Sequence, residues 1–187
     1  GQVIYTATAD DSADVSDGVT FSLAAGSDSA LSIDADSGAV TLNADPDHET
    51  QSEYNFAVVA TDAAGNVSQA QSVTLDINNL DDTAAVITSG DTADAIDENS
   101  GAGQVIYTAT ADDTADVSDG LAYSLAAGSD AALSIDAGTG AVTLNADPDH
   151  ETQSQYSFTV VATDVAGNKS AGQSVTLDIT DIDDTAA

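Results

Sequence analysis

The chain has 187 residues, and 33 acidic residues against one lysine and no arginine give it a formal charge of −32. Such a charge repels nucleic acid and anionic lipid, which excludes both as electrostatic partners. The absence of cysteine excludes a disulfide framework, a thiolate metal site and a thiol nucleophile. No apolar run approaches the ~20 residues that cross a bilayer, so we expect no membrane insertion. Acidic chains with few aromatic residues are often disordered, but hydrophobic residues make up 42% here and recur at strand spacing, which indicates a folded protein.

The chain consists of two copies of one sequence repeat. Residues 1–85 align with residues 103–187 without a gap, and 17 of the 85 positions differ. A repeat of this length indicates domains stacked along one axis. At about 100 residues, one copy is long enough to bury its own core. We therefore expect two domains, residues 1–82 and residues 83–187, the second ending in the start of another linker. Gly1 aligns with the interior of the repeat, so we expect a fragment of a longer repetitive protein.

Short alternating segments separated by Gly, Asp, Asn and Ser predict strands along the whole chain, and no helical periodicity persists over ten residues. The first copy contains six such segments, because it has no counterpart of residues 83–102. Its open sheet edge can accept a foreign strand, and we expect this domain to be the less stable one. In the second copy, the segments predicted as strands are residues 85–88, 104–111, 121–125, 133–136, 141–144, 156–163 and 174–179.

The strongest strand pattern begins at Tyr156, where alternate residues up to Ala162 fall on one face. A second stripe with a period of two runs from Val175 to Ile179. The segment 136–140, Asp-Ala-Gly-Thr-Gly, predicts a tight turn, because glycine supplies the positive φ that such turns need. Seven short strands in about 100 residues predict an all-β fold of two tandem Greek-key β-sandwich domains.

Glutamate is the scarce acid in this chain, with four residues among the 33 acidic ones. Glu49 and Glu151 occupy the same place in a duplicated Asp-His-Glu, and Glu98 lies in Asp97-Glu98-Asn99. Glu53 is replaced by Gln155 in the second copy and is interpreted as ordinary surface. The glutamate side chain, which is longer than that of aspartate, recurs at specific positions in these motifs, and this predicts ligation of a hard cation.

These residues resemble the extracellular cadherin repeat, which has an immunoglobulin-like Greek-key fold. Five family motifs occur here in order and cover nearly the whole chain: Pro-Glu-Asn, Asp-Arg-Glu, Asp-x-Asp, Ala-x-Asp and the linker Asp-x-Asn-Asp-Asn-Ala-Pro. The matching segments are residues 97–99 for the first motif, 47–49 and 149–151 for the second, 111–113 for the third, 60–62 and 162–164 for the fourth, and 79–85 and 181–187 for the linker.

The resemblance implies three Ca²⁺ ions at the junction of the two repeats. Because several residues depart from the family motifs, we expect two or three ions there. The implied ligands are Asp47, Glu49, Asn79, the Leu80 carbonyl, Asp81, Asp82, the Thr83 carbonyl, Asp113 (with Asp112 as the alternative after a one-residue shift), a loop carbonyl near Asp119, and Asp164. A second, half-built set at the C-terminal end comprises Glu98, Asp149, Glu151, Asp181 and Asp184. Calcium takes 6–8 oxygen ligands in flexible geometry, and extracellular modules bind it at about 10⁻⁴ to 10⁻³ M.

Enzymatic activity is not expected. The sequence has no nucleophile-elbow serine, no glycine-rich phosphate loop and no thiolate zinc set. The two histidines, His48 and His150, lie at equivalent places in the two copies, where the family has an exposed arginine, and are interpreted as exposed surface residues.

The resemblance extends to the repeats of giant secreted bacterial adhesins of the RTX type. It implies calcium-rigidified extender repeats in an extracellular or cell-surface protein. The implied partners are adjacent repeats of the same chain, with glycans or a host or cell surface reached through other domains. The alternatives are a carbohydrate-binding or homophilic adhesion module, and an accessory sandwich attached to a polysaccharide-degrading enzyme. All five tyrosines lie inside strand patterns, which disfavours an exposed carbohydrate platform.

Overall fold

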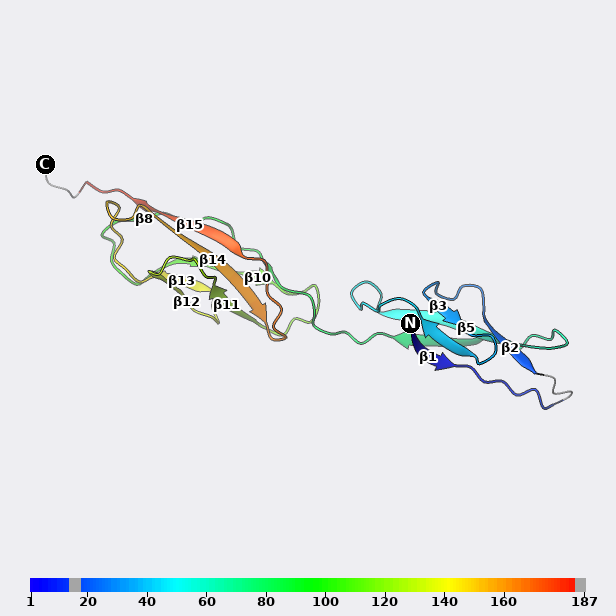
Figure 1. Cartoon of the computed structure of the whole chain (residues 1–187). Coiled ribbons are helices and arrows are strands. Elements are labelled where there is room, and N and C mark those ends of the chain that lie inside the picture. The colour runs from blue at the N-terminus through cyan, green and yellow to red at the C-terminus, as the bar shows by residue number, and fades with distance from the viewer. Residues whose placement is uncertain (14–17, 184–187) are drawn as a thin grey trace. The chain divides into compact units, whose positions relative to one another are not determined.

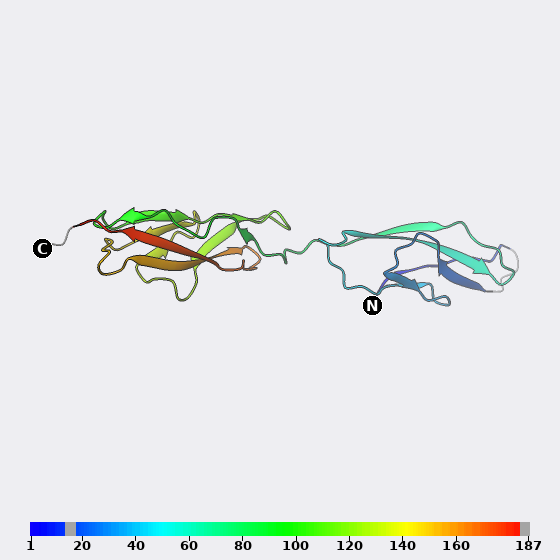
Figure 2. The same cartoon turned by 90° about the horizontal axis from the view of Figure 1, so that it is seen from above.

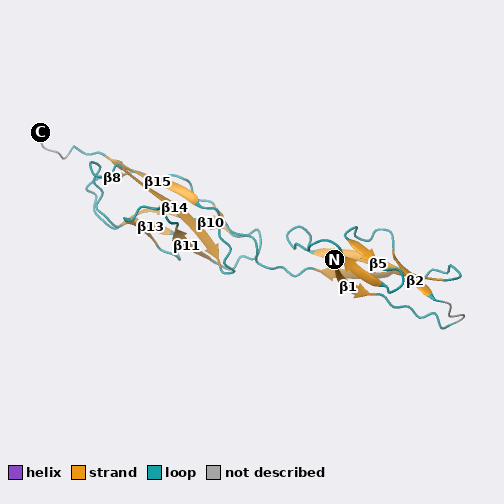
Figure 3. Cartoon of the chain, viewed as in Figure 1, coloured by secondary structure: helices purple, strands orange, loops and turns teal. Residues whose placement is uncertain are grey.

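The computed structural model describes residues 1–13 and 18–183. The chain divides into two compact units, Gly1–Leu80 (unit 1) and Asp81–Ala187 (unit 2), and each is described by itself. Every regular element in the described part is a strand, and the rest is loop and turn (Figure 3). The all-β prediction is therefore confirmed.

Unit 1 is a sandwich of two three-stranded antiparallel sheets (Figure 1). The first sheet has the order β1 (Gln2–Thr6), β4 (Ala39–Leu42) and β3 (Leu31–Ile33), and the second has the order β2 (Val19–Leu23), β5 (Glu53–Asp62) and β6 (Gln71–Asp76). The alternation predicted from the sequence places Tyr54, Phe56 and Val58 of β5 inside. These side chains pack with Val40 and Leu42 of β4 to form the core.

Unit 2 has the same two sheets, with additional strands at its edges (Figures 1 and 2). One sheet has the order β12 (Leu133–Ile135), β13 (Ala141–Leu144) and β9 (Gln104–Thr108). The other has the order β11 (Leu121–Leu125), β14 (Gln155–Asp164), β15 (Gln173–Thr180) and β8 (Ile96–Asp97). A separate pair joins β7 (Val86–Ile87) to β10 (Ala111–Asp112). The core lies between the sheets and includes Val142, Leu144, Val160 and Leu177.

The segment 104–111, predicted as one strand, forms two strands with different partners. Strand β9 pairs with β13 as far as Thr108, and the Ala109 N–H then donates to the Gly140 carbonyl at 2.9 Å. After this point the chain pairs with β7, beginning at Ala111. Gly140 has φ 71°, and a Cβ there would lie 2.5 Å from the Ala109 carbonyl oxygen, so the crossing needs glycine. The predicted turn at 136–140 thus also fixes where the strand changes partner.

Strand β8 was not predicted, because two residues carry no readable alternation. It pairs in parallel with the end of β15, Ile179 opposite Ile96 and Thr180 opposite Asp97. This pairing places Glu98, the next residue, beside the segment that leaves β15. The shortest strand of the second sheet therefore positions one of the candidate ligands.

Residues 91–97 cover the edge of β15 in unit 2. The Ala93 N–H donates to the Thr176 carbonyl at 2.9 Å, and the Thr176 N–H donates to the Asp91 carbonyl at 3.2 Å. Leu177 beneath this cover is 0% exposed, whereas its counterpart Leu75 in β6 is half-buried. The leucine at this position is therefore fully buried in unit 2 and only half-buried in unit 1.

A cavity of about 430 Å³ in unit 1 lies where unit 2 is filled. Its lining includes Tyr5, Phe21 and Val58. In unit 2, Ile87 packs against the core, and the hydroxyl of Tyr107, the counterpart of Tyr5, donates to the Gly90 carbonyl at 2.5 Å. The cavity supports the prediction that unit 1 is the less stable unit.

Truncation of the equivalent leucines tests this difference in packing. Leu177→Ala is expected to destabilise unit 2 by about 2–5 kcal/mol, because it removes a fully buried side chain. Leu75→Ala is expected to cost less, because its side chain already lies partly in water. Calorimetric unfolding of both variants in chelator gives the two losses. Equal losses would contradict the covering role of residues 91–97.

Candidate metal centres

Unit 2 begins with an aspartate cluster, defined here as Asp81, Asp113, Asp116, Asp119 and Asp164. Asp113 directly follows β10, and Asp164 is the last residue of β14. Because Leu121 pairs with Asp164 across β11 and β14, the loop 113–120 meets the end of β14. The strand ends thus gather these carboxylates at one end of the sandwich.

Three carboxylates of the cluster have a buried oxygen without a hydrogen-bond partner. Asp113 and Asp164 are 8% and 6% exposed. Asp164 Oδ1 accepts the N–H groups of Gly167 at 2.7 Å and Asn168 at 2.8 Å, while its Oδ2 has no partner. Asp113 Oδ2 and Asp81 Oδ2 are also buried without a hydrogen-bond partner. Buried polar atoms are nearly always partnered, so these three oxygens are candidate ligand atoms for a cation.

The charges of the cluster lead to the same conclusion. Burial raises the pKa of Asp81 and of Asp113, and the neighbouring carboxylates of Asp164, Asp119 and Asp116 raise both further. Two ion pairs within residues 1–13 and 18–183, His48 with Glu49 and His150 with Asp181, lie outside the cluster. A cation placed among like charges that face one another in this way would reduce their repulsion.

Two members of this site, Asp116 and Asn168, were not predicted. The Asn168 side-chain amide donates to the Asp81 carbonyl at 3.0 Å and to Asp81 Oδ1 at 3.3 Å. Asp116 Oδ2 accepts the N–H groups of Asp82 at 2.9 Å and Thr83 at 3.2 Å. Both side chains therefore fix the start of unit 2 to its loops.

The sequence holds a signal for Asn168 that was overlooked. Both copies contain Asp-x-Ala-Gly-Asn, at residues 62–66 and 164–168. In unit 1 the Asn66 amide donates to Asp62 Oδ2 at 2.7 Å. The motif therefore forms the same loop twice, and in unit 2 its asparagine reaches Asp81.

The other predicted ligands near this end differ in their surroundings. Asp112 is exposed and accepts the Thr114 N–H at 3.0 Å, and hydrogen bonds from Thr114 lower its pKa. Asp113, not Asp112, thus lies in the cluster. Asp119 and Asp82 are exposed, and Thr83 is half-buried.

At the other end of unit 2, Glu98 joins two segments of the chain. Its side chain is 2% exposed, and Oε1 accepts the Ile182 N–H at 2.5 Å while Oε2 accepts the His150 N–H at 2.9 Å. These hydrogen bonds, the one from Ile182 first, lower the pKa of Glu98. The carboxylate is therefore ionised and held in place by backbone donors.

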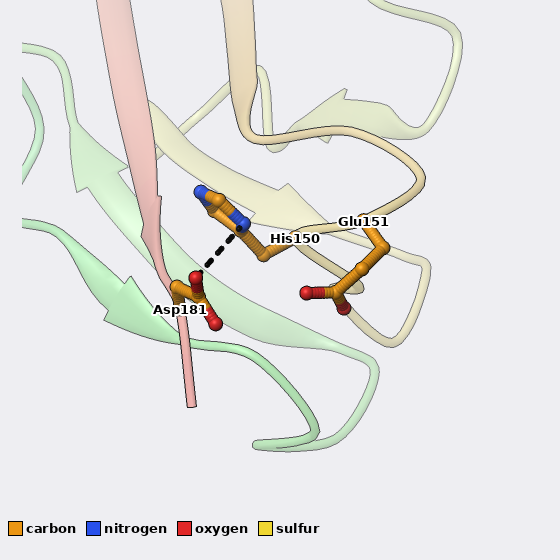
Figure 4. A group of neighbouring side chains, drawn as sticks. All are labelled: His150, Glu151 and Asp181. Atoms are coloured by element: carbon orange, nitrogen blue, oxygen red, sulfur yellow. Dashed lines mark ion pairs between the residues drawn. The ribbon is translucent and has the colours of Figure 1, made fainter. Parts of the chain in front are cut away.

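Two overlapping groups of possible ligands surround Glu98. The first group consists of one oxygen each from Glu98, Asp149 and Glu151, and these atoms lie within 4.8 Å of one another. The second group consists of one ligand atom each from His150, Glu151 and Asp181, at the same spacing. In the second group, His150 Nδ1 lies 3.8 Å from Asp181 Oδ2, and the Glu151 carboxylate is turned toward this pair (Figure 4). The structure thus brings together four of the five residues predicted for this set, and Asp184 lies outside the described residues.

Unit 1 carries the counterpart of this loop in its Asp-His-Glu. Asp47 accepts the N–H and the hydroxyl of Thr50, both at 3.0 Å, and these bonds lower its pKa. His48 Nδ1 lies 3.2 Å from Glu49 Oε1. The carboxylates of Asp47 and Glu49 are exposed.

The end of unit 1 runs beside the same loop. The Ile77 N–H donates to the Ser52 carbonyl at 2.9 Å, just before the predicted ligands Asn79 and Leu80, both of which are exposed. The four predicted ligands of unit 1 therefore occur on two segments that are hydrogen-bonded near their ends.

Comparison with known proteins identifies the family. The cadherin domain model matches residues 1–78 and 94–180, so the chain belongs to the cadherin domain family. Human protocadherin Fat 1 is 29% identical to it over 188 residues, which cover 98% of this chain and 4% of that protein. The chain thus spans a small part of this curated relative. The relatives in the cadherin family are adhesion proteins and not enzymes.

Solved structures show the same fold. The EC22-24 fragment of mouse cadherin-23 is 25% identical with a TM-score of 0.64, covering 89% of this chain and 55% of that one. The EC1-2 fragment of human protocadherin-24 is 17% identical with a TM-score of 0.74, covering 95% of this chain and 88% of that one. The predicted tandem cadherin-like sandwiches are confirmed. No helix long and apolar enough to span a membrane occurs in the described residues.

Substitution of Asp113 tests the electrostatics of the aspartate cluster. In chelator at pH 7, Asp113→Asn is expected to raise the thermal midpoint of unit 2 by a few degrees, because it removes a buried charge that faces other carboxylates. A raised pKa means that this carboxyl favours folding at low pH and that the contribution is lost as the pH rises through its folded-state pKa. The advantage of the variant should therefore shrink as the pH falls toward the ordinary value of 3.8.

Asp112→Asn is the matched control, because Asp112 is exposed and lies outside the cluster. Its thermal midpoint at neutral pH should rise less than that of Asp113→Asn, because the Asp112 carboxylate is exposed and hydrogen bonds from Thr114 lower its pKa. A lower midpoint for Asp113→Asn in chelator at neutral pH would show that the cluster is not electrostatically strained.

Proposed function

We propose that this chain is a pair of calcium-stiffened extender repeats from an extracellular or cell-surface adhesion protein. Cadherin domains are typical of extracellular adhesion and generally bind Ca²⁺ at the linkers between domains. The observation that carries the proposal is the aspartate cluster of unit 2, where three buried carboxylate oxygens have no hydrogen-bond partner.

The donor atoms of the cluster fit calcium. All of them are oxygens of carboxylates, amides or backbone carbonyls, which are the ligands of hard cations. Magnesium demands nearly ideal octahedral geometry and retains several waters, whereas calcium accepts 6–8 oxygens at variable angles. A crowded set of carboxylates from a linker and two loops therefore favours calcium.

The proposed ligands of the linker ions come from both units. Unit 2 contributes Asp81, Asp82, the Thr83 carbonyl, Asp113, Asp164 and the region of Asp119, and we add Asp116 because its carboxylate lies within the cluster. Unit 1 contributes Asp47, Glu49, Asn79 and the Leu80 carbonyl. Asp112 is the weaker candidate, because its carboxylate serves a local turn.

A second calcium set is proposed at the far end of unit 2, with Glu98, Asp149, Glu151, Asp181 and Asp184. The lowered pKa values of Glu98 and Asp149 keep these carboxylates ionised, as calcium ligands must be. Repetition of the same ligands at the end of each repeat supports a mechanical role. Ions at successive linkers would stiffen an array that holds a binding domain away from the cell.

We also propose that the parent protein is a secreted bacterial adhesin. The near-identity of the two copies supports a large array of recently duplicated repeats, as in secreted bacterial adhesins. Adjacent repeats would be the direct partners, and glycans or a cell surface would be reached by other domains. Homophilic association is the alternative for these domains themselves.

Calcium titration tests the extender function. One site at a hundredfold excess of free calcium over Kd stabilises the folded state by about 2.7 kcal/mol, so the thermal midpoint should rise between chelator and 10 mM Ca²⁺. Small-angle scattering should change from the profile of a flexible pair to that of a rigid pair. The scattering mass reports self-association in the same experiment.

The double variant Asp113→Asn/Asp164→Asn should lose most of both responses, whereas Asp112→Asn should keep them. Magnesium at the same concentration should produce a smaller effect. The extender function would be refuted if Ca²⁺ changed neither the thermal midpoint nor the scattering profile.

A further inference from the structure

We propose that His150, Glu151 and Asp181 form a binding site for a divalent transition-metal ion of the zinc class, and that unit 1 does not have this site. Sequence reasoning treated both histidines as exposed surface residues. In the structure, ligand atoms of His150 and of the Glu151 and Asp181 carboxylates lie within 4.8 Å of one another at the end of unit 2 (Figure 4).

The ligand chemistry separates this site from a calcium site. Imidazole nitrogen is a preferred ligand of Zn²⁺, Cu²⁺ and Ni²⁺, whereas Ca²⁺ takes oxygen ligands. One imidazole and two carboxylates provide three protein ligands and leave a fourth position for water. Zinc bonds of about 2.0–2.2 Å place tetrahedral ligand atoms about 3.4 Å apart. His150 Nδ1 and Asp181 Oδ2 are 3.8 Å apart, so small side-chain rotations bring them to that spacing.

The two segments that carry these ligands are already held together. The N–H of His150 and the N–H of Ile182, next to Asp181, both donate to the buried carboxylate of Glu98. Glu98 is in turn fixed by strand β8, which pairs with the end of β15. Glu98 is therefore a positioning residue, and little ordering is needed when the ion binds.

Unit 1 is a natural control for this inference. It has the same Asp-His-Glu, but the counterpart of Asp181 is Asn79, one of the 17 positions that differ. His48 Nδ1 contacts Glu49 Oε1 at 3.2 Å, and no group of His48 with two carboxylates was found in the described residues. Asn79 in place of Asp181 therefore removes one carboxylate ligand from the unit 1 counterpart of this set.

The inference does not depend on the calcium proposal. The zinc-class ion uses His150, whereas the proposed calcium set uses Glu98 and Asp149 and shares only Glu151 and Asp181 with it. The two ions would compete for the shared carboxylates, so zinc binding should weaken when calcium is added. The primary test is therefore made in calcium-free buffer.

Calorimetric titration of the two-unit chain with ZnCl₂, in metal-free buffer at neutral pH, should give one dominant site per chain. His150→Gln and Asp181→Asn should each weaken that site at least about tenfold, since loss of an outer-shell partner alone costs about 10–100-fold. His48→Gln should leave it unchanged. Asp181→Asn gives unit 2 the residue that unit 1 has at this position.

Paramagnetic Co²⁺ provides a measurement that needs no variant in the metal site. The chain has two histidines, so NMR distinguishes their ring signals once the His48→Gln spectrum assigns them. At substoichiometric Co²⁺, the His150 ring signals should broaden before those of His48. His150→Gln should keep the calcium response of the wild type, which separates a failure of this inference from a failure of the extender function.

Three results would overturn the inference. One is a zinc affinity that does not change in His150→Gln, and another is equal broadening of both histidine rings. Equal losses in His48→Gln and His150→Gln would likewise show nonspecific binding to exposed imidazoles.

Discussion

The structure depends on carboxylates that the polypeptide satisfies only in part. In the aspartate cluster, backbone N–H groups bind one oxygen of Asp164, and its other oxygen has no partner. The chain has one lysine and no arginine, so it has few cations of its own to place there. The folded state of unit 2 therefore costs free energy that an external cation would offset, which couples metal binding to folding.

The buried carboxylates at the two ends of unit 2 have opposite pKa shifts. At the cluster, burial and neighbouring carboxylates raise the pKa values of Asp81 and Asp113. At Glu98, backbone donors on two segments lower the pKa of an equally buried acid. The difference is whether a carboxylate faces other carboxylates or N–H groups. The first arrangement would be stabilised by a bound cation, while the second is ordered by backbone hydrogen bonds and can hold ligands in advance.

Much of this arrangement was readable from the sequence, because the long strands alternate and the acids repeat at equivalent places. The two-residue strand β8 and the break at Ala109 were not readable, since neither carries a pattern of its own. The choice between Asp112 and Asp113 depends on strand register, because a shift of one residue moves a side chain to the opposite face. Asp116 was missed because its contacts with Asp82 and Thr83 join residues more than 30 positions apart.

Near-identical repeats need not bind identical ions. The two copies have the same Asp-His-Glu loop, hydrogen-bonded internally in the same way through Asp47 and Asp149. They differ in the residue that follows the last strand, Asn79 or Asp181, and in the cover that brings Glu98 to that loop. A carboxylate in place of an amide adds a charged ligand beside the imidazole, and the covering strand fixes its position. In the zinc-class site that we propose, one substitution at the end of a strand would change the metal preference of a repeat without changing its fold.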